Sequence, residues 1–205
     1  MAVDDAGSSV PGDLLLATFA TDVAGPGDRV AAPVDTSLVV DDALEAAGAS
    51  LVRTRVGDVH VAERATEAGV VFGGEPSGAW IFPAETLCPD GPLAAVRLSA
   101  LAAERPLSER VAGFDPYPIR RTNHRTDRTA AVVDAVREAC AGSGESVSTL
   151  DGVRVSRDDG WFLVRASGTQ PLVRVTAEAR DPAAADDLLA TAEGLVTAAI
   201  ERTGE

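Results

Sequence analysis

Residues 29–74 read RVAAPVDTSLVVDDALEAAGASLVRTRVGDVHVAERATEAGVVFGG, and this stretch decides the fold of the first half of the chain. Short runs of small apolar and β-branched residues alternate with longer segments in which apolar residues recur at helical spacing. Gly48 and Gly69 follow the two helical segments, where glycine commonly ends a helix. Three strands joined by two helices through short connections predict a layered α/β domain with a mostly parallel sheet.

The elements predicted around this stretch continue the alternation. Helices are expected at Gly12–Ala24, Thr36–Ala47, Asp58–Ala68 and Asp90–Glu104, and strands at Arg29–Val34, Ser50–Thr54, Val70–Phe72 and Trp80–Phe82. A segment rich in proline and arginine, residues 105–118, then interrupts the pattern and is predicted to be a linker. The first domain is therefore expected to span residues 1–104.

The order of elements changes after this linker. Two helices are predicted, Asp127–Ala141 and one that begins at Pro182, together with strands at Ile119–Arg125, Ser146–Leu150, Val153–Ser156, Trp161–Arg165 and Leu172–Ala179. Consecutive strands between two helices favour antiparallel pairing. Residues 119–205 are therefore predicted to form an α+β domain with an antiparallel sheet and two helices.

The chain is acidic, and all its basic residues are arginine. It has 32 Asp and Glu against 18 Arg, no Lys, and a formal net charge of −14. Such a halophile-like surface stays soluble in concentrated salt, where charge repulsion is screened; GC-rich coding is the alternative explanation for the missing lysines. A negative surface with only 4% aromatic residues argues against general nucleic-acid binding.

Other features exclude a membrane or secreted protein. No stretch approaches the roughly 18 consecutive apolar residues of a membrane span, and the N-terminal MAVDDAGSSV carries acid where a secretory signal carries base. Cys88 and Cys140 are too few for a disulfide framework and are not spaced as a metal site, so both are expected to be small core residues. The protein is expected to be cytoplasmic.

The segment Arg165–Pro171, RASGTQP, connects two predicted strands and concentrates groups that bind phosphate. A guanidinium offers bidentate hydrogen bonds, the hydroxyls of Ser167 and Thr169 offer two more donors, and Gly168 allows backbone N–H groups to approach an anion. The alternative is an ordinary tight turn, because short strings of Ser, Gly, Thr and Pro are common between strands.

A second glycine-rich segment, GGEPSG at residues 73–78, follows the strand predicted at Val70–Phe72. The carboxylate of Glu75 can accept protons from two neighbouring sugar hydroxyls, and the hydroxyl of Ser77 can donate or accept beside it. Taken alone, this segment is a weak signal, and an ordinary structural loop is the favoured interpretation.

In this order and across a linker, the two loops resemble the C-terminal half of the phosphoglucomutase/phosphomannomutase family. These enzymes are the α-D-phosphohexomutases, and they include phosphoglucosamine mutase. RASGTQP resembles the phosphate-binding signature of the family's fourth domain, and GGEPSG resembles the sugar-recognition loop of its third. Residues 12–16 (GDLLL), 53–58 (RTRVGD) and 90–91 (DG) resemble further third-domain motifs.

The resemblance assigns the site residues in two groups. The residues that would hold the phosphate of a hexose phosphate are Arg165, Ser167, Gly168 and Thr169. The residues that would read the sugar are Glu75 and Ser77, with Arg55 facing the site.

The resemblance also indicates what this sequence lacks. Family members move a phosphoryl group between two hydroxyls of one sugar through a phosphoserine in the first domain, with Mg²⁺ held by an aspartate-rich loop in the second. Neither loop occurs here, so no catalytic residue and no metal ligand is assigned. Without a metal and a covalent carrier, positioning alone does not neutralise the charge of phosphoryl transfer. The chain by itself is expected not to be a competent mutase.

Two partners are therefore expected, a hexose phosphate and a separately encoded N-terminal half. A mis-called start codon would produce the same sequence. Two local departures from the family pattern, Gln170 in place of Glu and Ala79 in place of His, leave room for a non-catalytic phosphosugar-binding or regulatory module, or a decayed fragment. Pro76 and Pro92 are further departures, and each removes a backbone N–H.

The two histidines add no catalytic or metal site. His60 falls on a predicted helix and His124 near the end of a predicted strand, without a second His or Cys nearby in the sequence. Both are interpreted as structural or solvated residues.

Overall fold

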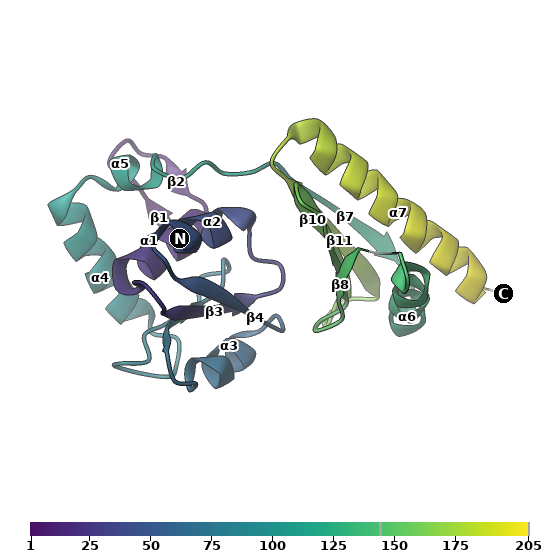
Figure 1. Cartoon of the computed structure of the whole chain (residues 1–205), viewed down its shortest axis with the longest axis horizontal. Helices are drawn as coiled ribbons and strands as arrows, with labels where there is room; N and C mark the ends of the chain where they lie inside the picture. Colours follow the sequence, from purple (N-terminus) through teal and green to yellow (C-terminus); the bar gives the residue numbers. More distant parts are fainter. Residues whose placement is uncertain (144, 205) are drawn as a thin grey trace. The chain divides into compact units, whose positions relative to one another are not determined.

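The computed structural model describes residues 1–143 and 145–204, which form two compact units that divide between Pro116 and Tyr117. Each unit has its own sheet (Figure 1). The fold class is as predicted, an α/β unit followed by an α+β unit.

The first unit is built on a four-stranded sheet in the order β4-β3-β5-β6. Its strands are β3 (Arg29–Pro33), β4 (Ser50–Thr54), β5 (Val70–Gly74) and β6 (Trp80–Ile81). β3 runs parallel to both β4 and β5, whereas β6 pairs with β5 in the antiparallel direction. The sheet is therefore mostly parallel, and at its one reversal the GGEPSG segment supplies the last two residues of β5 and the turn that leads to β6.

Five helices belong to this unit, and two of them begin at a side-chain cap. The five are α1 (Gly12–Val23), α2 (Leu38–Ala46), α3 (Asp58–Ala65), α4 (Gly91–Glu104) and α5 (Leu107–Val111). Ser37 caps α2 by accepting a 3.2 Å hydrogen bond from Val39 N–H, and Asp90 caps α4 by accepting one of 2.8 Å from Leu93 N–H. A short polar side chain at this position satisfies a backbone donor that the helix leaves unpaired.

The helices cover the sheet on both faces. On one face, Val61 and Ala65 of α3 pack against Ala31, Val70 and Ile81. On the other, Phe19 of α1 lies in an aromatic cluster with Phe72, Trp80 and Phe82, at ring-centroid distances of 6.0, 5.3 and 5.7 Å. Because both faces are buried, β5 and all but the first residue of β3 are apolar rather than alternating, as expected for a parallel sheet.

Two features of this unit were not predicted. A short hairpin of β1 (Ala2–Val3) and β2 (Ser9–Val10) precedes α1. The segment expected to be a linker contains α5, whose Leu107 is buried and whose Ser108 hydrogen-bonds to Asp5. The Pro and Arg content hid this helix, because one of the prolines, Pro106, stands just before its first turn, where proline is well tolerated.

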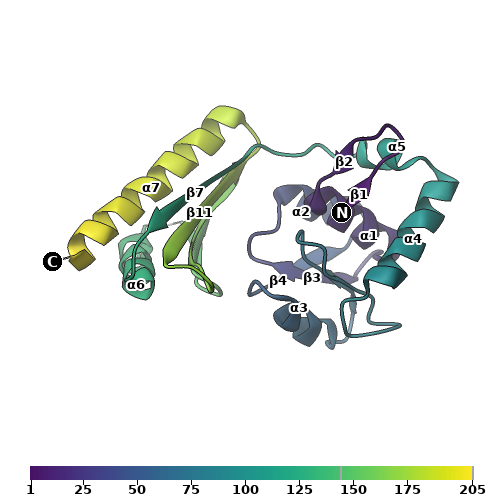
Figure 2. The same cartoon turned by 180° about the vertical axis from the view of Figure 1, so that it is seen from behind.

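The second unit has a five-stranded antiparallel sheet in the order β7-β11-β10-β9-β8. Figure 2 labels the neighbouring strands β7 and β11 of this sheet and the two helices of this unit. The strands are β7 (Ile119–Arg125), β8 (Ser146–Ser148), β9 (Val153–Ser156), β10 (Gly160–Ala166) and β11 (Leu172–Ala179). Two helices, α6 (Thr129–Cys140) and α7 (Pro182–Gly204), pack on one face of the sheet and bury a core with alternate strand residues such as Phe162, Val164 and Val175.

The prediction for the cysteines is half wrong. Cys140 is buried in the core of the second unit, where desolvation raises the pKa of its thiol. Cys88 is exposed, because it follows a turn in which Phe82 C=O accepts hydrogen bonds from the backbone N–H groups of Glu85 and Thr86. Among the helices of residues 1–143 and 145–204, none combines the length and apolar character needed to cross a membrane.

Candidate functional site

The carboxyl ends of three parallel strands place the polar loops of the first unit at one edge of the sheet. β3, β4 and β5 lie side by side and run in the same direction, so the segments 35–37, 55–57 and 75–77 all leave from that edge. In open α/β sheets this edge is the usual location of ligand sites. The predicted residues Arg55, Glu75 and Ser77 therefore come from neighbouring loops.

Glu75 is the best-anchored member of this group. Its side chain is buried, and Oε1 accepts a 2.7 Å hydrogen bond from the backbone N–H of Gly57. The hydroxyl of Ser77 donates to the other oxygen, Oε2, at 3.4 Å. Each carboxylate oxygen has two lone pairs, so both keep capacity to accept further donors. The group is held in place by the protein while still able to receive the hydroxyl protons of a ligand.

Close backbone contacts fix the loop that carries Glu75. A Cβ added at Gly12 would lie 1.9 Å from the carbonyl oxygen of Pro76, so only glycine lets the start of α1 approach this loop. Gly73 and Gly74 lie against helices on opposite faces of the sheet. A Cβ added at Gly73 would meet Val61 of α3, and one added at Gly74 would meet Leu16 of α1. The GGEPSG segment is thereby clamped between α1 and α3.

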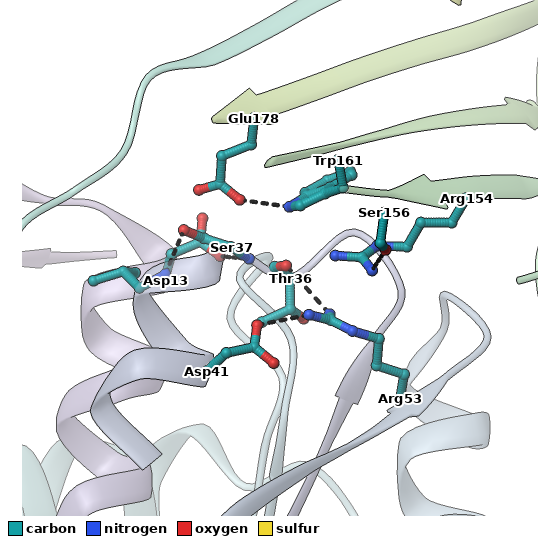
Figure 3. A network of polar contacts seen from close by, with 10 residues as sticks. Asp13, Thr36, Ser37, Asp41, Arg53, Arg154, Ser156, Trp161 and Glu178 are labelled. Atoms are coloured by element: carbon teal, nitrogen blue, oxygen red, sulfur yellow. Dashed lines mark hydrogen bonds and ion pairs between the residues drawn. The ribbon is translucent and has the colours of Figure 1, made fainter. Parts of the chain in front are cut away.

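Arg55 has an exposed side chain, and among the described residues it makes no hydrogen bond or ion pair through its guanidinium. Arg53, two residues earlier, is instead a structural residue. It donates to Asp41 Oδ2 at 2.6 Å and to the carbonyl of Thr36 at 3.3 Å, as Figure 3 shows. Of the two arginines in RTRVGD, Arg55 is thus the one available to a ligand.

The same edge contains residues to which the sequence analysis gave no individual role. Asp13 Oδ1 accepts a 3.1 Å hydrogen bond from the backbone N–H of Ser37, which ties the start of α1 to the start of α2 (Figure 3). Thr36 lies between them with a fully buried side chain. In the sequence Asp13 was visible only as part of the GDLLL motif. Its contact with Ser37, 24 positions later, depends on the fold.

Three of the predicted phosphate-binding residues, Ser167, Gly168 and Thr169, lie in the turn that joins β10 to β11, and Arg165 lies on β10 just before it. The strands pair up to Ala166 and Val173, and the turn is closed by a 2.9 Å hydrogen bond from Ser167 N–H to the carbonyl of Leu172. The backbone N–H of Thr169 lies 3.5 Å from Ser167 Oγ. An added Cβ at Gly168 would meet no atom within 4 Å, so the turn is open to an approaching ligand.

Arg165, on the last part of β10, is held in place by the neighbouring loop. Its Nη1 lies 3.9 Å from Oδ2 of Asp151, and both side chains are mostly buried. Gly152 makes this approach possible: it adopts a φ of 77°, and an added Cβ would lie 2.3 Å from the carbonyl oxygen of Val164. Asp151 is therefore an ion-pair partner of Arg165 that the sequence analysis did not identify.

Further along the same sheet face, two polar contacts are buried. Trp161 Nε1–H donates to Oε2 of Glu178 at 2.7 Å across the β10–β11 pair (Figure 3). Arg154 donates to Ser156 Oγ at 2.6 Å, and its guanidinium lies over the Trp161 ring, 4.6 Å from the centroid. These contacts fix the sheet that carries the turn, since Trp161 and Glu178 are both fully buried.

Neither histidine extends the site. His60 lies on α3, and His124 on β7, with its Nε2 3.7 Å from Glu193 Oε1. Within the described ranges, 1–143 and 145–204, no three His, Cys, Asp or Glu side chains are grouped so as to hold a metal ion. The residues present do not fit a Mg²⁺ site, and no chemistry through a metal is assigned to them.

Family comparison accounts for almost the whole chain. Residues 11–117 match the model for phosphoglucomutase/phosphomannomutase, alpha/beta/alpha domain III. Residues 119–194 match the model for the C-terminal domain of the same proteins. The two matches meet close to the division between the structural units.

Curated relatives carry the same pair of domains within longer chains. "Probable phosphoglucosamine mutase" from Methanococcoides burtonii is 44% identical over 202 residues, which are 98% of this chain and 46% of that protein. A protein of the same name from Methanopyrus kandleri is 44% identical over 185 residues, covering 88% and 41%. The chain thus spans less than half the length of the curated relatives it matches.

Solved structures agree on the fold. A phosphoglucomutase/phosphomannomutase family protein from Burkholderia thailandensis matches with a TM-score of 0.84 and 25% identity, over 96% of this chain and 43% of that one. An Aspergillus fumigatus N-acetylphosphoglucosamine mutase, solved with GlcNAc-6P and magnesium, has a TM-score of 0.64 at 17% identity, over 92% and 41%. This chain therefore belongs to the phosphoglucomutase/phosphomannomutase family, of which it contains the third and the C-terminal domain.

Proposed function

We propose that this chain is the phosphosugar-binding portion of a phosphohexomutase. In this proposal Arg165, Ser167, Gly168 and Thr169 hold the phosphate of a hexose phosphate, and Glu75, Ser77 and Arg55 contact the sugar. The observation that carries it is the β10–β11 turn, in which Arg165 is oriented by Asp151 beside an open backbone and two hydroxyls. Charge-assisted hydrogen bonds from such a set suit a phosphate dianion.

Glu75 supports the sugar half of the proposal. Its carboxylate is fixed by Gly57 and Ser77 but retains free lone pairs, which is the arrangement needed to accept two hydroxyl protons. Arg55 would face the same loop edge as an unpaired cation. These assignments predict binding and orientation of a substrate rather than bond breaking.

We infer that turnover requires residues beyond those of this chain. The sequence has no serine loop and no aspartate-rich loop of the family type, and its described residues contain no carboxylate cluster for Mg²⁺. The missing elements would come from a polypeptide resembling the N-terminal half of the longer relatives, either preceding this segment or encoded separately. The chain alone is expected to bind a phosphosugar without converting it.

Helix α4 provides a surface that suits such a partner. Only Ala94 and Leu101 of this helix are buried, and Arg97 and Glu104 are its only charged residues. Its exposed residues are otherwise small or apolar, and Val96 has a relative exposure of 68%. An exposed helix with only two charged residues is unusual on a chain with a net charge of −14, and such surfaces commonly mark protein contacts.

The compartment proposed is the cytoplasm. Cys88 and Cys140 are both free thiols, one exposed and one buried, which suits a reducing environment.

Calorimetry tests the binding proposal. The chain is titrated with glucose 1-phosphate, glucose 6-phosphate, glucosamine 6-phosphate and mannose 6-phosphate, next to Arg165→Ala and a control, Arg137→Ala, which removes an arginine from α6. Measurable affinity for at least one ligand, lost in Arg165→Ala and kept in Arg137→Ala, is expected. Equal, negligible binding by all three proteins would eliminate the proposal and favour a decayed fragment.

A mixing experiment distinguishes a split mutase from a non-catalytic regulatory module. An N-terminal half from a relative is added with Mg²⁺, and interconversion of 1- and 6-phosphosugars is measured. Activity in the mixture supports a split mutase. Phosphosugar binding without activity in any mixture favours the second candidate, a non-catalytic phosphosugar-binding module. This candidate is suggested by Gln170 and Ala79, the two positions at which the loops depart from the family pattern.

A further inference from the structure

The second sheet has two faces of opposite character. One face packs α6 and α7 and is apolar, with Phe162, Val164, Val173 and Val175 among its members. Because side chains alternate across a strand, the intervening residues belong to the other face. This face, here called the arginine face, contains five of the chain's 18 arginines, Arg121, Arg125, Arg154, Arg165 and Arg174.

Strand register places these arginines in adjacent rows. Arg174 on β11 is directly opposite Arg165 on β10, and on its other side directly opposite Asn123 on β7. Arg121 and Arg125 flank Asn123 two residues away on the same face of β7. The only acidic strand residue on this face is Glu178, which is two rows further along and accepts a hydrogen bond from Trp161.

The arginines of this face differ in their partners. Arg154 is bonded to Ser156 and stacked on Trp161, and Arg165 lies near Asp151. By contrast, the guanidinium groups of Arg121, Arg125 and Arg174 make no hydrogen bond or ion pair with any residue in 1–143 or 145–204, and their side chains are exposed. The chain has 32 acidic side chains, so leaving three adjacent arginines unpaired is not forced by a shortage of acids.

Arg165 and Arg174 are like charges on opposed strand positions, and they differ in compensation: Arg165 lies 3.9 Å from Asp151, whereas Arg174 makes no ion pair among the described residues. Directly opposite residues of an antiparallel pair have Cβ atoms about 4.5–5.5 Å apart, and like charges in this position destabilise a sheet. A monophosphate in the β10–β11 turn would neutralise Arg165 and leave Arg174 uncompensated. Two linked phosphoryl groups would match the two neighbouring guanidinium groups, with Arg125 and the amide of Asn123 as additional donors on β7.

We propose that the arginine face binds the diphosphate group of a ligand, with one phosphoryl group at Arg165 and the second at Arg174. This inference rests on the proposed assignment of Arg165 to a phosphate. A ligand of this class, such as a nucleoside diphosphate or a sugar joined to one, would compete with a phosphosugar for the turn. Arg174 would then decide between diphosphate and monophosphate ligands without contacting the sugar.

Inorganic pyrophosphate is the probe, compared with inorganic phosphate by calorimetry in metal-free buffer at low salt. Pyrophosphate is expected to bind about tenfold or more tightly than phosphate, and Arg174→Ala is expected to lose that preference, because one charge-assisted contact is worth about a factor of ten. Arg174→Lys should recover part of it, since lysine keeps the charge without the planar fork. Arg137→Ala, on the opposite side of the sheet, should behave as the unmodified chain.

The outcomes separate this inference from the proposed function. Phosphosugar binding that depends on Arg165, together with a pyrophosphate preference that depends on Arg174, supports both. Phosphosugar binding without any pyrophosphate preference, or an unchanged preference in Arg174→Ala, overturns the inference and leaves the proposed function standing. Circular dichroism would show whether Arg174→Ala has lost its fold. In that case the preference for pyrophosphate over phosphate is tested on Arg174→Lys instead.

Discussion

Glu75 and Gly57 are joined by a 2.7 Å hydrogen bond in which the Gly57 backbone N–H donates to the buried carboxylate. Gly57 adopts a φ of 126°, a backbone conformation that residues with a Cβ rarely adopt. The contact links the loop after β4 to the turn after β5. It thereby connects two motifs that are separate in the sequence, RTRVGD and GGEPSG.

Glu75→Ala should weaken both the fold and the sugar contact. The substitution leaves the Gly57 N–H without its acceptor in a partly buried place, which costs about 1 kcal/mol in free energy of unfolding. Glu75→Gln keeps an acceptor oxygen and is expected to lose less stability but to bind a phosphosugar more weakly. Urea unfolding and calorimetry measure the two effects; equal stability of both variants and the parent would contradict the account of this contact.

Gly12→Ala should destabilise the first unit, whereas Gly168→Ala should not. A Cβ at Gly12 would lie 1.9 Å from the Pro76 carbonyl oxygen, so the GGEPSG segment or α1 must move. Overpacking of this kind costs about 1–3 kcal/mol or more. A Cβ at Gly168 meets nothing within 4 Å, but it would stand where a phosphate approaches the turn. Thermal melting and phosphosugar titration are expected to separate the two variants cleanly.

Trp161→Phe should lower the stability of the second unit. It removes the indole N–H that donates to Glu178 at 2.7 Å, and a fully buried carboxylate that loses a donor costs about 1–3 kcal/mol. Glu178→Gln retains an acceptor for Trp161 and should cost less. Denaturant unfolding followed by circular dichroism compares them, and the reverse order of stabilities would refute the interpretation.

Protonation of Asp5 should loosen the hairpin from α5. Hydrogen bonds from the Ser108 backbone N–H and hydroxyl favour the carboxylate and hold the pKa of Asp5 below its ordinary value of 3.8. Because the pKa is lower in the folded than in the unfolded chain, this contact stabilises the fold above about pH 4, and the contribution is lost as the pH falls through the folded pKa.

NMR titration of the Ser108 amide measures this effect. The midpoint of the Asp5-linked shift is expected below 3.8, and Ser108→Ala should move it upward by removing the hydroxyl donor. A midpoint at or above 3.8 in the unmodified chain would show that the contact does not form in solution.

Val96→Glu should leave the fold intact while reducing association with an N-terminal-half polypeptide. Val96 is 68% exposed on α4, and exposed substitutions away from special contacts change stability by about 0.5 kcal/mol or less. Val59→Glu, at an equally exposed position on α3, is the matched control. Analytical ultracentrifugation of each variant with the partner tests the surface, and equal pairing by both variants would exclude α4.

Much of the fold was predictable because its signals are local. Helical periodicity, capping residues such as Asp90 and terminal glycines such as Gly48 act within a few residues. Short elements were missed for the same reason. The two-residue strands β1 and β2 carry no periodicity of their own, and α5 lies in a segment whose prolines indicated a linker.

The candidate site was predictable only in part. RASGTQP and GGEPSG were visible as loop sequences, and the turn between β10 and β11 lies where the strand pattern put it. The partners that orient them were not visible, because Asp151 near Arg165 and Gly57 near Glu75 depend on contacts between separate strands and loops. The exposure of Cys88 was not predicted, because the local sequence does not show whether a small apolar residue near a turn faces the core or the solvent.

The sequence by itself determined the order of the longer elements, the class of each unit and the two loops rich in ligand-binding groups, because propensity, periodicity and turn chemistry are properties of neighbouring residues. Only the tertiary structure decided which side chains meet. Strand register set Arg174 opposite Arg165, and close packing at Gly12 fixed the loop that carries Glu75. Register and packing arise from the burial of whole surfaces, so no single segment of the sequence encodes them.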